Sequence, residues 1–180
     1  MRKWLFWNGS LGLLHSQVPP LIIASIINIS DLNFDTPFKY SSSVLSVVVL
    51  ALIAIAIGME IHVIHANQGR YQLKEFKLSY GKIIEGLDTN KIVGRYWNPL
   101  ILIRWVIYIA FLVFLNQNCV AQILFLLMIS VIFQIIIIIG IPMIEKSDQR
   151  ITWILEISIS IYLYVLLSLT DFMRENTARE

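Results

Sequence analysis

Long apolar blocks dominate this sequence. The stretch from Val120 to Ile141 is almost entirely apolar, and it is as long as the run of about 20 residues that a helix needs to cross a bilayer. Hydrophobic residues make up 57% of the chain and charged residues only 14%, whereas about a quarter of a soluble domain is charged. A water-soluble fold could not bury that much hydrocarbon. The sequence therefore predicts an all-α fold, a polytopic transmembrane helix bundle.

The apolar blocks predict about five membrane-spanning helices within a single membrane domain, residues 1–180. The first block contains the pair Pro19–Pro20 near its middle, where we expect the helix to kink or break. A polar stretch from Asp31 to Ser43 follows it and is typical of a loop. The expected spans cover residues 4–29, 44–65, 99–115, 120–141 and 152–169.

A long polar stretch, residues 66–97, separates the second and third expected spans. It is rich in lysine and arginine, and cytoplasmic loops carry an excess of these residues, so we expect this loop to be cytoplasmic. With five crossings, the N-terminus and the turn before the last span lie on the same side of the membrane as this loop. Within the loop, apolar residues recur at helical spacing with lysines between them, which predicts an amphipathic interfacial helix lying on the membrane surface. These residues are Leu73, Phe76, Tyr80, Ile83 and Leu87.

Charged residues also occur within the expected spans, namely Glu60, Arg104 and Glu156. At a rise of about 1.5 Å per residue, their distances from the predicted cytoplasmic ends place them in one intramembrane polar layer. A charge in hydrocarbon is costly unless it is paired, so we expect Arg104 to bond Glu156 or Glu60 across helices. Such a layer has two possible roles. It could form a gate or ion path, or it could be a structural clamp between helices. The clamp is the favoured interpretation.

The residue patterns of common enzymes and metal sites are missing. The sequence has no Gly-rich phosphate loop, no nucleophile elbow and no paired carboxylates beside a base, so we expect no enzymatic activity, no catalytic residues and no cofactors. His62 and His65 follow Glu60 without an evident third ligand, and no metal site is expected. Cys119 is the only cysteine, which excludes an intrachain disulfide. A net charge of +2 argues against nucleic acid as a partner. The expected partners are the lipid bilayer and either copies of the chain or other membrane subunits.

Short motifs spread along the chain resemble a known membrane region. The most specific block is Tyr80–Leu87, which reads Y-G-K-I-I-E-G-L and precedes an L-I-R motif at residues 102–104. Together with other motifs, it resembles the C-terminal membrane region of large ciliate transmembrane proteins that carry cysteine-rich, EGF-like or furin-like ectodomain repeats. That region is itself similar to the TRP-like (transient receptor potential-like) membrane domain of fungal proteins. The other motifs are Phe6–Gly9, Ser25–Asn28, Phe111–Leu115, Ile154–Ile157 and Leu169–Phe172.

The resemblance implies a fragment or short copy of a longer polytopic protein, in which another helix follows Asp171–Phe172. It implies no substrate and no catalytic residue. The chain departs from the family's pattern because it lacks the ectodomain and a second arginine after Arg104, so partner binding and sensing are not carried over. The leading hypothesis is a TRP-like membrane domain, a candidate ion channel or transporter. The alternative is a non-catalytic membrane anchor of a surface receptor or an accessory subunit of a membrane complex.

Overall fold

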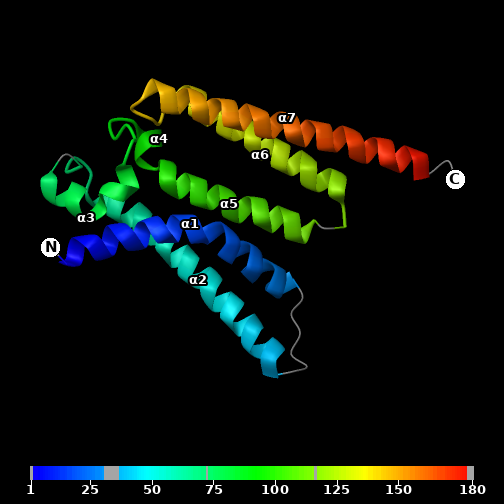
Figure 1. Cartoon of the computed structure of the whole chain (residues 1–180), viewed down its shortest axis with the longest axis horizontal. Helices are drawn as coiled ribbons and strands as arrows, with labels where there is room; N and C mark the ends of the chain where they lie inside the picture. Colours follow the sequence, from blue (N-terminus) through cyan, green and yellow to red (C-terminus); the bar gives the residue numbers. More distant parts are fainter. Residues whose placement is uncertain (1, 31–36, 72, 116, 178–180) are drawn as a thin grey trace.

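The described part of the chain is almost entirely α-helical (Figure 1). The computed structural model describes residues 2–30, 37–71, 73–115 and 117–177. The expected all-α fold is therefore confirmed. The helices are α1 (Arg2–Ser30), α2 (Pro37–Ala66), α3 (Lys74–Ile84), α4 (Ile92–Arg95), α5 (Trp97–Phe114), α6 (Cys119–Gly140) and α7 (Lys146–Thr177).

Among the described residues, four helices are long and apolar enough to cross a membrane. They comprise Tyr40–Ala66 of α2, the whole of α5, the whole of α6, and Lys146–Thr170 of α7. In α1, Ser16–Ile29 is a shorter apolar stretch. Helices suit a bilayer because each satisfies its own backbone hydrogen bonds where no water is present. The chain is therefore a multi-pass membrane protein.

Helices α2 and α7 are longer than the apolar blocks that predicted them. α2 begins at Pro37, so the last part of the expected loop is helical, while residues 31–36 lie outside the described residues. Proline is favoured in the first turn of a helix because its missing N–H is not needed there. α7 runs from Lys146 to Thr177 and so includes most of the charged turn before it and much of the polar tail after it.

Helix α1 continues through its two prolines. Pro19 and Pro20 both lie inside the helix, and Figure 1 shows α1 bending part-way along its length. A proline inside a helix removes one backbone hydrogen bond and its ring crowds the preceding turn, which favours a bend. Of the two outcomes expected at these prolines, the structure shows a bend and no break.

Helix α5 lies at the centre of the bundle. It packs against α1 and α2 on one side and against α6 on the other, and α7 packs on α6 (Figure 1). Buried apolar side chains fill both contacts, where close packing rather than removal from water stabilises helices in lipid. The cluster between α1, α2 and α5 comprises Val18, Ile22, Ile26, Ile53, Leu102 and Ile109. The cluster on the α6 side comprises Leu87, Trp97, Ile129, Phe133 and Ile137.

One end of the bundle gathers the segments that are rich in lysine and arginine. The segment after α3 lies against the turn between α6 and α7, where the N–H of Asp88 donates to the carbonyl of Pro142 at 2.8 Å. In return, the N–H of Ile144 donates to the carbonyl of Gly86 at 3.0 Å. Helix α1 contacts α3, and the N-terminus lies at this same end (Figure 1). The N-terminus, the long loop and the turn after α6 thus lie at one end of the bundle.

Helix α3 is amphipathic, and part of its apolar face packs against protein. Phe76 and Ile83 are buried against Ile64, near the end of α2, and Tyr71, which follows that helix. The Tyr71 hydroxyl donates to the carbonyl of Ile64 at 2.7 Å and holds the turn in place. The expected helix is therefore present, and two of its apolar side chains contact the end of α2, while its position at the membrane surface stays a prediction. Of the other residues that predicted the helix, Tyr80 is partly buried, Leu73 is exposed just before α3 and Leu87 is buried beyond its end.

Candidate functional site

The candidate site is an ion pair inside the bundle, between Arg104 of α5 and Glu156 of α7. Both terminal nitrogens of the guanidinium donate to the carboxylate, Nη1 to Oε1 and Nη2 to Oε2, the second bond being 2.6 Å long. Only 10% of the Arg104 side chain and 9% of the Glu156 side chain are exposed. Paired bonds of this kind are strong and fix the orientation of both groups. Of the two carboxylates expected as partners, the structure pairs Arg104 with Glu156.

Aromatic rings enclose the Arg104 guanidinium. Its Cζ atom lies 4.8 Å from the centre of the Tyr108 ring and 4.5 Å from the centre of the Phe133 ring. Nη2 also donates to the Tyr108 hydroxyl at 2.7 Å. A cation facing an aromatic ring is attracted by the electrons of that ring, and the attraction grows when water is excluded. The rings therefore stabilise the charge of Arg104 within an apolar part of the bundle.

A wider hydrogen-bond network links this ion pair to α6. The Ser130 hydroxyl donates to Glu156 Oε2 at 3.5 Å and lies 2.9 Å from the Ser160 hydroxyl oxygen. The Gln134 amide donates to the Ser160 hydroxyl at 2.6 Å and to the Glu156 carbonyl at 3.1 Å. Each helix contributes two polar residues spaced by four, which places both on the same face. The network joins Arg104 and Tyr108 of α5, Ser130 and Gln134 of α6, and Glu156 and Ser160 of α7.

Glu60 does not belong to this network. It is buried on α2, with 3% of its surface exposed. Among the residues that the structure describes, the hydrogen bonds of the Arg104 guanidinium go to Glu156 and Tyr108 and not to Glu60. Figure 1 shows α2 and α7 on opposite sides of α5. Arg104 therefore pairs with Glu156, and the expectation that the three charges lie at one depth in the membrane stays a prediction.

The geometry of the pair suits holding helices together better than binding a passing ion. To coordinate a cation, Glu156 would have to release Arg104. Both charges would then be unpaired among apolar side chains, which costs several kcal/mol per ion. The two bonds of the guanidinium thus link α5 to α7.

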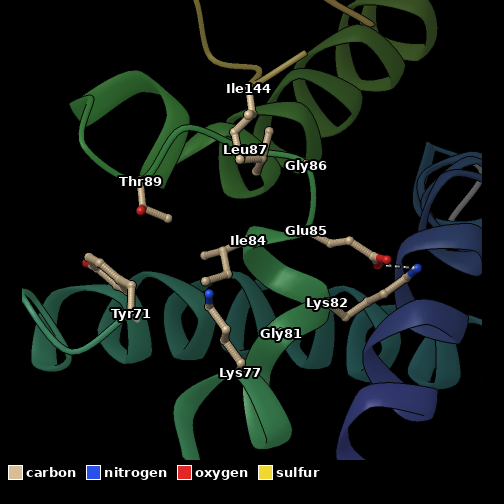
Figure 2. A pocket seen from close by; sticks show the side chains of 10 residues that line it. All are labelled: Tyr71, Lys77, Gly81, Lys82, Ile84, Glu85, Gly86, Leu87, Thr89 and Ile144. Carbon is tan, nitrogen blue, oxygen red and sulfur yellow. Dashed lines mark hydrogen bonds and ion pairs between the residues drawn. The ribbon is translucent and has the colours of Figure 1, made fainter. Parts of the chain in front are cut away.

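A separate cavity of about 440 Å³ lies between α3 and the turn after α6 (Figure 2). Ile84 and Leu87 give it apolar walls, and Thr89 and Lys77 add polar groups. The amino group of Lys82 bonds the carboxylate of Glu85 at 2.8 Å, and Figure 2 shows this ion pair pointing away from Thr89 toward α1. Both partners of the pair are more than half exposed, so it contributes little to stability.

The histidines at the end of α2 lie on its surface. His62 and His65 are exposed, and the side chain of Gln68 lies 3.1 Å from Nδ1 of His65. Of the residues that the structure describes, no three His, Cys, Asp or Glu side chains gather in a group that could hold a metal ion. A metal ion in a stable protein site has three or more such ligands, and the described part of the chain does not assemble them.

Comparison with known proteins does not assign this chain to a family. No family model, no curated protein and no solved structure matches this chain. The function is therefore inferred from the packing of the helices and from the bonds of Arg104 and its neighbours.

Proposed function

We propose that this chain is a TRP-like membrane domain that acts as a non-catalytic packing module, either as the anchor of a surface receptor or as an accessory subunit of a membrane complex. The observation that carries the proposal is the central position of α5. The place where a single-chain bundle would need a pore is filled by this helix and by its packed side chains. The ion pair between Arg104 and Glu156 then serves to hold α7 against α5.

The extent of the polar network supports the same proposal. Its members on each helix are four residues apart, which corresponds to about 6 Å along a helix axis, whereas the hydrocarbon core is about 30 Å thick. Beyond Tyr108, the rings of Phe111 and Phe125 stack face to face with their centres 4.6 Å apart. This apolar contact between α5 and α6 lies beyond the network, so in the part of the chain that the structure describes the network forms no continuous polar path across the bilayer.

The outer faces of the helices support a role in packing against lipid or partner subunits. Only 11% of the apolar segment of α7 is buried within the chain. Ile154, Ile161 and Val165 of this helix are exposed, and such side chains are suited to lipid tails or to the apolar face of another helix. A helix that packs on α6 along one side and exposes its opposite side is well placed to receive a partner.

Liposomes that contain the wild-type chain are expected to pass ions no faster than protein-free liposomes, because the polar network does not cross the bilayer. The measurement is dye-reported cation and anion flux, with a known pore-forming peptide as the positive control. Two variants test whether any flux passes through the chain. Arg104→Gln removes the buried pair, and Glu85→Gln breaks only an exposed ion pair. Flux well above that of protein-free liposomes that is abolished by the first variant and unchanged by the second would contradict the proposal. Circular dichroism would verify that both variants remain helical.

We also propose that the end of the bundle that holds the long loop faces the cytoplasm, as its lysines and arginines indicate. Cys119, the only cysteine, is exposed at the start of α6, at the opposite end. A membrane-impermeant maleimide added to intact cells is therefore expected to label Cys119. In a matched variant that carries Cys119→Ser and Ser147→Cys, labelling should require permeabilised cells. The reverse pattern of labelling would contradict this orientation.

A further inference from the structure

A second cavity of about 560 Å³ lies at the end of the bundle where α6 turns into α7. Its apolar side is formed by Ile137, Ile138 and Ile141, near the end of α6. Its polar side is formed by Lys91, from the long loop, and by residues of the first turns of α7. The cavity thus combines hydrocarbon and positive charge at the end of two membrane-spanning helices, where the hydrocarbon core of a bilayer gives way to lipid headgroups.

The polar side of this cavity is formed by one face of α7. Lys146, Gln149, Arg150 and Trp153 all line it, and their spacing of three, four and seven residues places them on one side of a helix. The Gln149 amide donates to the carbonyl of Ile137 at 2.7 Å, which ties this face to α6. Trp153 is 40% exposed, and an indole in this setting is typical of the headgroup level of a bilayer.

The charge of the cavity is positive. Lys146 and Arg150 are exposed, and within the described ranges neither takes part in an ion pair. Lys91 donates to the carbonyl of Ile141 at 3.3 Å and lies 3.7 Å from the carboxylate of Asp88, the one acidic side chain in the lining. Three cations against one carboxylate leave the site ready to accept an anion.

We propose that this cavity binds the headgroup of an anionic phospholipid. The phosphate and the acidic headgroup would contact Lys146 and Arg150, whose guanidinium can hold two phosphate oxygens at once. The acyl chains would follow the exposed side chains of Ile138 and Ile141 along α6. Basic pockets at the cytoplasmic ends of membrane helices favour anionic lipids in this way. The proposal is independent of whether the chain acts as an anchor, a subunit or a channel.

Tryptophan quenching by lipids with brominated acyl chains tests the proposal on the full chain in mixed micelles. The contribution of Trp153 is the difference between the wild-type chain and Trp153→Phe. We expect brominated phosphatidylserine to quench this contribution at a mole fraction at least about tenfold lower than brominated phosphatidylcholine, because hydrogen bonds to charged groups strengthen binding by about that factor or more. The double variant Lys146→Gln and Arg150→Gln should abolish the preference for phosphatidylserine.

The matched control is the double variant Arg70→Gln and Lys77→Gln, which removes one arginine and one lysine outside the cavity and should keep the preference. Equal loss in both double variants would show a general attraction between charges and overturn the proposal, as would the absence of any preference in the wild-type chain. Soluble glycerol phosphate should fail to displace the lipid. Displacement by this headgroup fragment would show a site for free phosphate compounds and would also overturn the assignment to lipid.

Discussion

Replacing Arg104 with leucine is expected to lower the free energy of unfolding by about 3 to 5 kcal/mol, because Glu156 is left as an unpaired charge inside the bundle. The same loss is expected for Glu156→Leu, which leaves the Arg104 guanidinium between two rings without its carboxylate. The measurement is a denaturant titration of the chain in lipid-detergent micelles, followed by circular dichroism.

The double variant Arg104→Leu and Glu156→Leu should recover most of this loss, because replacing a buried ion pair by apolar residues is often neutral or stabilising. The coupling energy from this double-mutant cycle isolates the contribution of the pair. The exposed pair of Lys82 and Glu85 is the control, and Glu85→Leu should change stability by less than about 1 kcal/mol. Losses for Arg104 and Glu156 that simply add in the double variant would refute the role of this pair as a clamp.

Replacing Gly94 with alanine is expected to lower the free energy of unfolding by about 3 kcal/mol, at the upper end of the range for overpacked sites. A Cβ atom on Gly94 would lie 2.2 Å from the carbonyl oxygen of Asp88 and 3.0 Å from that of Pro142. Both obstacles are backbone atoms, and the N–H of Asp88 already donates to the same Pro142 carbonyl. The added methyl group would therefore push the long loop away from the turn after α6.

The matched control for this prediction is Gly81→Ala in α3. A Cβ atom at Gly81 meets no other atom within 4 Å, and alanine is a better helix former than glycine by about 0.5 to 1 kcal/mol. The control should therefore be neutral or slightly stabilising in the same titration. A Gly94→Ala variant as stable as the wild-type chain would mean that the long loop does not pack against the turn as the structure shows.

Much of the clamp is visible in the sequence. Arg104 and Glu156 stand out because charges are rare in apolar blocks, and the cost of an unpaired charge in lipid makes pairing the expected outcome. The remaining members of the network also leave a signal, since Tyr108, Ser130 and Ser160 each lie four residues from another member. A search for polar pairs at this spacing would have found them. The sequence does not say which helix faces which, so it left Glu60 and Glu156 as equal candidates.

The sequence was less informative at the ends of the helices. The apolar face of α3 has the same pattern whether it contacts lipid or the end of α2, because both remove the same side chains from water. Phe76 and Ile83 contact protein, and only the positions of α2 and α3 in space decide this. The start of α2 was missed for a related reason. Serines at its beginning are typical of a loop by composition, but the helix continues through them from Pro37.

Hydropathy along the chain was enough to determine that this protein is a helical membrane protein, because lipid accepts only segments whose backbone bonds are satisfied internally. The order of the apolar blocks was enough to predict that the N-terminus, the long loop and the turn after α6 lie on one side. The tertiary structure decided that α5 is the central helix, that Arg104 bonds Glu156, and that α3 packs on protein. These contacts join residues far apart in the chain. Which helices pack together depends on the shapes of their side chains, and no local pattern in the sequence predicts this.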